Sequence, residues 1–494
     1  MNLKKIKLSS LFILLNIFVL FTSVLFIEEI YKLQFSDSEY FKNQALSNRQ
    51  KIDIIEAKRG SILDREFNEV SETINAFNIG IYPEQIDDKE LVSELLAPLL
   101  QLDKVTIFER LKNNKNYFYL KRNVDFEIGT KINNWNYKGI NVEKSSKRII
   151  YSDSLKQIIG HVDPDGNGIE GLELYFDNSL KGTDGELRYE AAPNGDFIPQ
   201  GKSSILDPVH GEDLILSIDS ELQYISENLC TEALKATQAF KCSVVFVNAE
   251  NGEIIISAEK SSTNNKYFNI NLISGRALYE PGSALKIFTV GSLLEKNEVN
   301  ENDTYYVEDK IEIIEESCNK NYEGLKGCFR DFLKHDPYEL TVKEIIERSS
   351  NVGTIKITQN SNVSEIENFL MKFGFGKKTG VELTGETRGG FIDYKRCVTC
   401  LSSLSIGYSV NVSQYQMVRA YSIIANGGND VKLTLTQKDN VDVEDIEIIS
   451  AEMSSRLKKL LINVVEGENG TGKSLRKEGY IIGGKTGTSR THLE

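Results

Sequence analysis

The sequence predicts an α/β protein with one membrane anchor and with a sheet assembled from distant parts of the chain. Three observations support this prediction. An uncharged apolar run covers residues 11–27, a hairpin pattern covers residues 242–258, and helical patterns from 283 to about 426 give way to a strand pattern at 480–488. An early hairpin, central helices and a late strand indicate a sandwich whose sheet joins segments far apart in sequence.

The length and the charge of the chain limit its organisation and its partners. A chain of 494 residues exceeds what one hydrophobic core supports, so we expect two or three domains. The formal net charge of −14 would repel a phosphate backbone, and the sequence contains no basic cluster with interleaved aromatic residues. We therefore expect no nucleic-acid partner.

The apolar run at residues 11–27 has the length of a single membrane span, because a helix over it would measure about 26 Å. Lysines precede the run, and Glu28 and Glu29 close it. The basic flank predicts a cytoplasmic tail at residues 1–10 and export of everything after the span. A cleaved signal peptide is the alternative, but no small-x-small cleavage site follows the run, so we favour an uncleaved anchor.

Six cysteines would lie in an oxidising compartment if the chain is exported. Cys397 and Cys400 form a CxxC pattern, but the chain has four histidines and no second CxxC, so we prefer a disulfide or buried thiols to a zinc site. Cys318 and Cys328 form a second plausible bridge, although the sequence leaves the pairing open. We expect no metal and no cofactor.

Two domains are expected after the anchor. Residues 28–205 mix short strand and helix patterns with turn-rich stretches. A linker begins residues 206–494, and a short strand and a helix capped by Asp219 or Ser220 come next. The hairpin that follows turns at an Asn-Gly pair, which is a strong hairpin signal.

The first candidate site is Ser283, at the start of a predicted buried helix, with Lys286 one turn later on the same face. Serine is a poor nucleophile unless a base removes its proton, and a lysine half buried among apolar residues is pushed towards the neutral form that can do so. The helix N-terminus adds a backbone N–H that points at a developing oxyanion. The pattern alone is weak, because a helix-capping serine with a solvated lysine is the plain alternative. The same Ser-x-x-Lys spacing recurs at Ser257, Ser317, Ser455 and Ser474.

Two further patterns accompany it. Ser349 and Asn351 form a Ser-x-Asn sequence after a predicted helix, and Lys485, Thr486 and Gly487 lie on the predicted late strand. Glycine in a strand lets a ligand approach the backbone closely. A second Lys-Thr-Gly, at residues 378–380, lacks the strand context and is interpreted as a turn.

Taken in order, Ser-x-x-Lys, Ser-x-Asn and Lys-Thr-Gly form the signature set of penicillin-binding proteins and serine β-lactamases. Flanking stretches make the resemblance specific to a class B penicillin-binding protein. The Glu-Pro-Gly-Ser form and the length of the preceding domain are most like the division-specific, septal branch. The resembling stretches are "AKRGSILDR" (57–65), "GNGIEGLELYFDNSLKGTDG" (166–185), "EPGSALKIFT" (280–289), "RSSNVGTIKI" (348–357), "FGFGKKTGVELTGE" (373–386), "SIGYSVNVSQYQMVRAYSIIANGG" (405–428) and "GTGKSLRKEGYIIGGKTGTS" (470–489).

The resemblance implies a fold, a set of domains and a location. Residues 206–494 would form a transpeptidase domain, which is an antiparallel sheet with helices on both sides. Residues 28–205 would form an elongated α+β pedestal of the non-catalytic, dimerisation type. A single pass at residues 11–27 would anchor the chain in the bacterial cytoplasmic (inner) membrane, with the catalytic domain on the periplasmic side.

The resemblance also implies a serine-type D,D-transpeptidase that cross-links peptidoglycan stem peptides during septal cell-wall synthesis. Ser283 would attack the penultimate D-Ala carbonyl and release the terminal D-Ala. Lys286 would be the general base, Ser349 and Asn351 would relay the proton and orient the substrate, and Lys485 would supply positive charge.

Substrate binding and partners follow from the same resemblance. Thr486, Gly487 and Thr488 would bind the terminal carboxylate, and the N–H groups of Ser283 and Thr488 would form the oxyanion hole. Stem peptides ending in D-Ala-D-Ala would be substrates, and β-lactams would be covalent inhibitors. A polytopic glycosyltransferase and divisome membrane proteins would contact the anchor and the pedestal.

The chain departs from the family pattern at three places. It has "EFNEV" where Asn-Gly usually follows "RGSILDR", and "IKI" and "KIF" replace commoner versions. In the family, two strands and a terminal helix follow the Lys-Thr-Gly strand, whereas this sequence ends at Glu494. We therefore expect a sequence cut short, with the C-terminal strands missing, the late strand without a ladder partner, Lys485 displaced and acylation weak.

Two alternatives stay open from the sequence. A β-lactamase shares the three motifs, but the pedestal and the "RGSILDR" stretch argue against it. A truncated, inactive division scaffold or β-lactam sensor would need only the anchor and the pedestal. Labelling by penicillin and rapid turnover of a cephalosporin distinguish these readings.

Overall fold

The computed structural model of the chain describes residues 8–36, 39–40, 44, 49–192, 198, 203–263, 266–268, 273–320, 323–393, 397–437 and 446–489. The chain divides into two compact units. The first comprises Met1–Lys58 and Lys181–Gly211, and the second comprises Arg59–Leu180 and Glu212–Glu494. The expected domain division at residue 205 stays a prediction.

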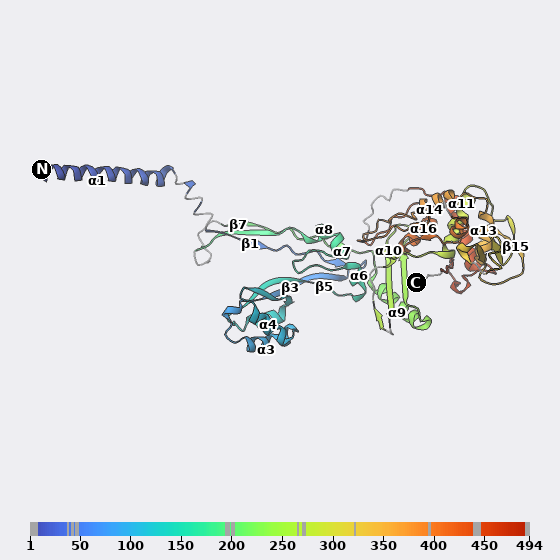
Figure 1. Cartoon of the computed structure of the whole chain (residues 1–494), viewed down its shortest axis with the longest axis horizontal. Helices are drawn as coiled ribbons and strands as arrows, with labels where there is room; N and C mark the ends of the chain where they lie inside the picture. The colour runs from blue at the N-terminus through green and yellow to red at the C-terminus, as the bar shows by residue number, and fades with distance from the viewer. Residues whose placement is uncertain are drawn as a thin grey trace. The chain divides into compact units, whose positions relative to one another are not determined.

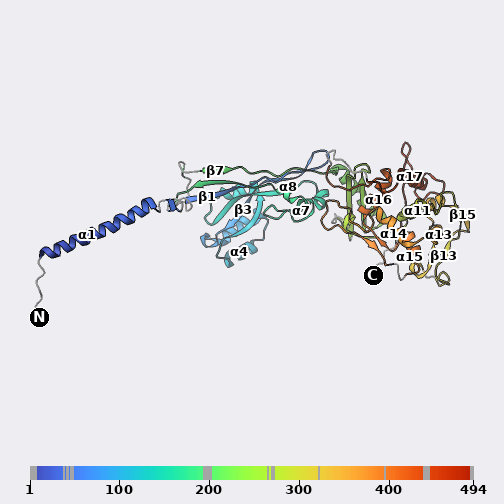
Figure 2. The same cartoon turned by 90° about the horizontal axis from the view of Figure 1, so that it is seen from above.

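The first unit carries a long apolar helix and a small sheet (Figures 1 and 2). Helix α1 (Leu8–Tyr31) contains the predicted apolar run, and its apolar side chains from Phe12 onwards are exposed. Among the described residues, one helix, Phe12–Phe35, is long and apolar enough to cross a membrane, with a mean hydropathy of 2.1. The antiparallel sheet comprises β1 (Gln50–Ile55), β6 (Gly185–Glu190) and β7 (Ser203–Leu206), in the order β1-β6-β7.

A five-stranded sheet opens the second unit. Its order is β4-β3-β2-β8, with β5 paired to β3, and every pair is antiparallel except β2 with β8. The parallel pair links the two segments of chain that make up this unit. The strands are β2 (Ile62–Leu63), β3 (Glu69–Ile81), β4 (Phe118–Asp125), β5 (Ile140–Ile150) and β8 (Leu214–Ile215).

Three helices pack with this sheet around one buried apolar cluster that includes Ile79, Leu96 and Ile107. Local sequence explains where two of them begin. Asp88 accepts a hydrogen bond from the Leu91 N–H at 2.9 Å, and Asp103 likewise caps the next helix. The helices are α3 (Lys89–Leu100), α4 (Lys104–Asn113) and α5 (Phe126–Asn133).

A largely buried cluster of charges joins Arg59 and Arg148 to two of the short helices that follow. Glu173 accepts from Arg59 Nε at 2.7 Å and from Arg148 Nε at 2.6 Å, and Asp177 accepts from Arg59 Nη1 at 2.7 Å. Glu173 is completely buried. We call these four residues the arginine–carboxylate cluster. The short helices are α6 (Lys156–Ile159), α7 (Gly171–Tyr175) and α8 (Asp177–Lys181).

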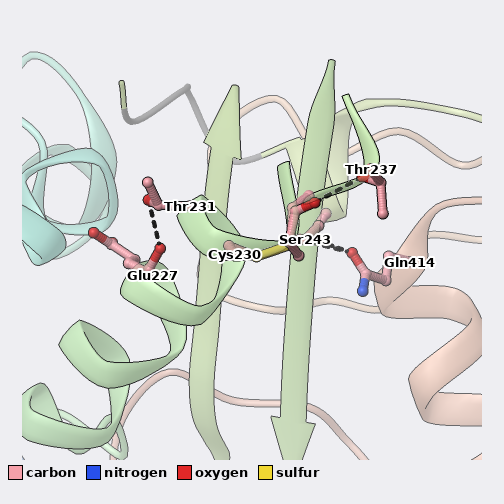
Figure 3. Close-up of a disulfide and its surroundings, with 9 residues drawn as sticks. Glu227, Cys230, Thr231, Thr237, Ser243 and Gln414 are labelled. Carbon is pink, nitrogen blue, oxygen red and sulfur yellow. Dashed lines mark hydrogen bonds between the residues drawn. A yellow bond between two sulfur atoms is a disulfide. The ribbon is translucent and has the colours of Figure 1, made fainter. Parts of the chain in front are cut away.

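The predicted hairpin is confirmed and belongs to an antiparallel sheet of order β11-β10-β9. Helix α9 (Ser220–Thr237) packs against β10, and Asp219 is its cap, accepting from the Leu222 N–H at 2.9 Å. Helix α16 (Gln414–Ala425) contacts β9 (Figure 3). The strands are β9 (Lys241–Val247), β10 (Ile254–Thr263) and β11 (Lys266–Phe268).

The helices expected between residues 283 and 426 form the main apolar core of the second unit, and Figures 1 and 2 show them gathered together. Helix α17 joins them through apolar residues at helical spacing that our sequence prediction did not use. The bounds are η4 (Gly282–Leu285), α10 (Ile273–Arg276), α11 (Lys286–Glu295), α12 (Val342–Arg348), α13 (Asn351–Thr358), α14 (Val363–Lys372), α15 (Cys400–Ser405), α16 (Gln414–Ala425) and α17 (Ala451–Glu466). Short strand pairs border them, namely β12 (Thr304–Val307) with β15 (Tyr338–Thr341), β13 (Lys310–Glu312) with β14 (Cys328–Arg330), and β16 (Gly390–Phe391) with β17 (Val410–Asn411).

All six cysteines are paired. The bridges Cys318–Cys328 and Cys397–Cys400 confirm the two expected local pairs. The third bridge, Cys230–Cys242, ties α9 to β9 (Figure 3), and the sequence did not reveal it. Disulfides of this kind persist in oxidising compartments.

The strand expected at residues 480–488 is wrong as a secondary-structure assignment. No described strand pairs with this segment, and a β pattern without a ladder partner does not form a strand. The segment instead contacts α17, where the Gly484 N–H donates to the Leu461 carbonyl at 3.1 Å.

Candidate active site

The turn that carries Ser283 is held by two distant segments. Gly282 has a φ of +54°, and its N–H donates to the Gly407 carbonyl at 2.9 Å. A Cβ atom on Gly282 would lie 2.3 Å from the carbonyl oxygen of Thr488, so only glycine permits this approach. The Gly-Ser sequence therefore brings Ser283 beside the C-terminal segment.

Ser283 itself is half-buried at the start of η4. The Tyr421 hydroxyl donates to the Ala284 carbonyl at 2.8 Å, which fixes the turn from the side of α16. Apolar residues then bury the whole of the following helix α11 as far as Leu294. This burial explains why Lys286, in the first turn of α11, is completely removed from solvent.

Lys286 is bonded to the Ser-x-Asn segment. Its Nζ donates to the Ser349 carbonyl at 2.6 Å and to Asn351 Oδ1 at 2.7 Å, and it lies 3.5 Å from Ser349 Oγ. Burial lowers the pKa of Lys286 well below its usual value, the nearby charge of Lys485 lowers it further, and the charge of Asp331 opposes both. The result favours a neutral amine that can accept a proton.

Ser349 lies at the break between two helices. It ends α12 with a left-handed backbone (φ +60°), and α13 begins two residues later after the N-cap Ser350. A serine in this conformation carries backbone strain, which is common at functional sites. The break presents both the carbonyl and the hydroxyl of Ser349 to the lysines.

Lys485 approaches the same serine from the C-terminal segment. Its Nζ donates to Ser349 Oγ at 2.7 Å, and burial lowers the pKa of Lys485 to about 7. The Thr486 hydroxyl donates to Thr471 Oγ1 at 2.8 Å, so the segment is also held at its side. We expected an unpaired segment to displace Lys485, and this expectation is wrong because these bonds hold the segment in place.

The structure thus brings together residues from three distant parts of the chain. Lys286, Ser349, Asn351 and Lys485 form one hydrogen-bonded group, which we call the two-lysine cluster. Ser283 lies on the turn beside this cluster. The backbones of Gly487 and Thr488 pass against the turn, since a Cβ on Gly487 would lie 3.1 Å from the Pro281 carbonyl oxygen. This arrangement can support nucleophilic attack by a serine with an amine as base.

Three residues of the site were not found from the sequence. Asp331 binds the start of α13, Tyr421 holds the nucleophile turn, and Glu280 accepts from the Ser409 N–H at 2.9 Å. Glu280 lies in the Glu-Pro-Gly-Ser stretch, so that stretch could have suggested it. Tyr421 lies in the resembling stretch at residues 405–428, which could likewise have suggested it, whereas Asp331 lies outside the three motifs and all the resembling stretches.

Two family descriptions match the chain. Residues 242–493 match the penicillin binding protein transpeptidase domain, which is about half of the chain, and residues 54–216 match the penicillin-binding protein dimerisation domain. These matches cover the two-lysine cluster and the arginine–carboxylate cluster respectively.

Curated proteins and solved structures resemble the chain over most of its length. Penicillin-binding protein PbpB of Mycolicibacterium smegmatis is 28% identical (96% of this chain, 79% of that protein), and peptidoglycan D,D-transpeptidase FtsI of Buchnera aphidicola is 29% identical (97% and 83%). The PBP2–MreC complex of Helicobacter pylori includes a chain of the same fold, with a TM-score of 0.73 at 20% identity (90% of both chains). Penicillin-binding protein 3 of Mycobacterium tuberculosis with aztreonam has a TM-score of 0.63 at 22% identity (89% and 83%). With a transpeptidase domain behind a dimerisation domain, the chain belongs to the class B penicillin-binding proteins.

Proposed function

We propose that the chain is a membrane-anchored peptidoglycan D,D-transpeptidase that works through an acyl-enzyme on Ser283. The observation that carries the proposal is the buried Lys286 amine, bonded to Ser349 and Asn351 beside the Ser283 turn. Relatives of the chain are named peptidoglycan D,D-transpeptidases, which supports the choice of substrate.

In the acylation step, the neutral amine of Lys286 accepts the proton of Ser283. The serine oxygen forms a bond to the penultimate D-Ala carbonyl carbon, and the amide bond to the terminal D-Ala breaks. The leaving amine takes a proton through the Ser349 hydroxyl, which lies between the two lysines. Asn351 orients the substrate amide. A neighbouring stem-peptide amine then attacks the ester carbonyl carbon, the bond from that carbon to the Ser283 oxygen breaks, and the proton that the amine loses returns to the Ser283 hydroxyl.

Substrate binding falls to the C-terminal segment. The Lys485 ammonium attracts the terminal carboxylate, with Thr486, Gly487 and Thr488 lining its site. The N–H groups of Ser283 and Thr488 stabilise the oxyanion, and each such donor is typically worth about 3 kcal/mol of transition-state stabilisation.

The apolar helix α1 supports a single pass through the cytoplasmic membrane, with the catalytic domain on the outer side. Peptidoglycan synthesis at the division septum is the proposed role. A polytopic glycosyltransferase and divisome membrane proteins are the proposed partners of the anchor and the dimerisation domain. A PBP2 of the same fold is found in a complex with MreC, which supports the expectation of a protein partner.

Fluorescent penicillin tests the proposal. We expect covalent labelling at Ser283, located by peptide mass spectrometry, and a loss of at least about 100-fold in labelling rate for Ser283→Ala. Ser455→Ala is the matched control, because Ser455 begins another Ser-x-x-Lys sequence on the exposed face of α17 and should label like the parent. Labelling retained in Ser283→Ala would overturn the assignment, and rapid turnover of a chromogenic cephalosporin would favour a β-lactamase.

A further inference from the structure

The carboxylate of Asp331 lies at the break between α12 and α13. Its Oδ1 accepts from the backbone N–H groups of Asn351 at 2.5 Å and Val352 at 3.0 Å, and its Oδ2 accepts from the Ser350 hydroxyl at 2.8 Å. The side chain of Asp331 is only 8% exposed. A buried carboxylate with three donors at a helix N-terminus is strongly held.

Capping alone does not explain this carboxylate, because α13 already has a cap. The Ser350 hydroxyl accepts from the Gly353 N–H at 2.8 Å, as an ordinary N-cap serine does. Asp331 comes from a separate segment, and it bonds to the cap residue Ser350 itself and to the two residues that follow it. Its role is therefore to tie α13 to another part of the fold.

The residue before Asp331 completes the grip on Asn351. The Arg330 carbonyl accepts from Asn351 Nδ2 at 2.8 Å. With its amide nitrogen fixed in this way, Asn351 must turn its Oδ1 to the opposite side, where it accepts from Lys286 Nζ at 2.7 Å. The backbone and the side chain of Asn351 are thus both set by two consecutive residues.

The segment that carries Asp331 is itself anchored. The Asp331 N–H donates to the Asp309 carbonyl at 3.0 Å, and β14 ends at Arg330 after pairing with β13. The Cys318–Cys328 disulfide closes the loop that leads into β14. A support made of a strand and a disulfide can hold a side chain more precisely than a free loop.

We infer that Asp331 is a positioning residue for the proposed reaction, which holds Asn351 and the Ser349 carbonyl where both can accept from the Lys286 amine. This inference rests on the proposed function. At the start of α13 the hydrogen bonds of Asp331 go to Ser350, Asn351 and Val352, so it acts on the Lys286 amine through Asn351.

The charge of Asp331 gives the inference a specific signature. Around Asp331 and Lys286 the charged and titratable groups are His335 (Nε2 to Asp331 Oδ2, 3.2 Å), Tyr338, Arg348 and Lys485. Asp331 raises the pKa of Lys286 against the effects of burial and of Lys485. Removing the charge should therefore lower the pKa of Lys286 further and extend acylation to lower pH.

The test measures the second-order rate of labelling by fluorescent penicillin against pH, using the full-length chain in detergent. For Asp331→Asn we expect a rate at least about tenfold lower at pH 7, together with an acidic limb moved by about 0.5 pH unit or more to lower pH. Glu344→Gln is the matched control, because Glu344 caps the neighbouring helix α12 through Thr341 and touches no proposed catalytic residue. Glu344→Gln should keep the parental labelling rate and the parental position of the acidic limb.

Two further variants separate geometry from charge. Asp331→Glu keeps the negative charge but moves the carboxylate away from its three donors. The labelling rate should therefore fall, while the acidic limb of the pH profile should stay where it is. His335→Phe puts another aromatic ring against Tyr338 and removes the imidazole beside Asp331, so an acidic limb that belongs to Lys286 should also stay.

The outcomes are distinct. Parental rates in both Asp331→Asn and Asp331→Glu would overturn the inference. A fall in Asp331→Asn with an unmoved limb, matched by an equal fall in Glu344→Gln, would show a merely structural role. If Asp331→Asn does not fold, the labelling rate of Asp331→Glu decides whether the positioning role stands. Labelling of the parent at a residue other than Ser283 would refute the proposed function instead.

Discussion

Two buried groups of charged side chains in this chain are built on opposite principles. In the arginine–carboxylate cluster, Arg59 and Arg148 both bond to Glu173, so opposite charges meet directly. In the two-lysine cluster, Lys286 and Lys485 meet around the Ser349 hydroxyl, and neither has a salt bridge with a carboxylate among the described residues. In the first arrangement each buried charge has a direct partner of opposite sign, although burial still lowers the pKa of Arg148. In the second, burial lowers the pKa of both lysines and no carboxylate is paired with either of them among the described residues.

The difference shows how to distinguish structural residues from catalytic residues in a buried polar site. A structural ion pair loses stability when it is broken, because one charge is left buried without a partner. A catalytic amine is instead kept partly destabilised, so that it can give up its proton near neutral pH. The same kind of substitution in each cluster should therefore have opposite consequences.

The largest effect is expected for Lys286→Met. Acylation by fluorescent penicillin should fall by at least about 1,000-fold, because no base remains beside Ser283. The free energy of unfolding at pH 7 should stay within about 2 kcal/mol of the parent. The variant loses the hydrogen bonds of Lys286, but it also no longer has the free-energy cost of burying the Lys286 amine. The sign follows from the lowered pKa of Lys286: the unfolded chain binds its proton more tightly, so Lys286 costs stability at neutral pH. Denaturant unfolding and labelling rates measure both quantities.

The mirror experiment is Arg59→Met in the arginine–carboxylate cluster. This variant leaves part of the Glu173 and Asp177 charge without its partner, so the free energy of unfolding should fall by about 3–5 kcal/mol. The labelling rate per folded molecule should stay close to that of the parent. Lys104→Met removes an exposed partner of Glu94 and should leave the free energy of unfolding close to that of the parent, because solvent screens an exposed ion pair. A large drop in labelling rate with little loss of stability would contradict the comparison.

Local sequence predicted the elements of the fold better than the contacts between them. Apolar spacing after Ser283 predicted α11, and an Asn-Gly turn predicted the hairpin, because both signals lie within a few residues of one another. The late strand was wrong because a strand depends on a partner that local pattern does not contain. The bridge Cys230–Cys242 was missed because six cysteines allow many pairings.

The same limit applies to the candidate site. The three sequence motifs contain every member of the two-lysine cluster. The resemblance to a known family, in which these motifs occur in the same order, indicated that they belong to one site. Asp331 and its bonds to Asn351 could not be foreseen, since an acidic residue in a loop between two strands is usually a solvated side chain. Its function depends on a tertiary contact that brings β14 to the start of α13.

The smallest expected effect is the change of the acylation rate with pH, which tests the charge on Lys485. Burial lowers the pKa of Lys485 to about 7, so its ammonium, which we propose attracts the substrate carboxylate, is lost as the pH rises through 7. Acylation by a carboxylate-bearing penicillin should therefore decline by up to about tenfold between pH 6 and pH 9. Lys485→Arg keeps the charge over this range, because the guanidinium titrates far above it, and so should abolish the decline even if its rate at pH 6 is lower. An unchanged decline in Lys485→Arg would assign the basic limb of the pH profile to another group. It would then give no support to separate roles for Lys286 as the base and Lys485 as the carboxylate-binding charge.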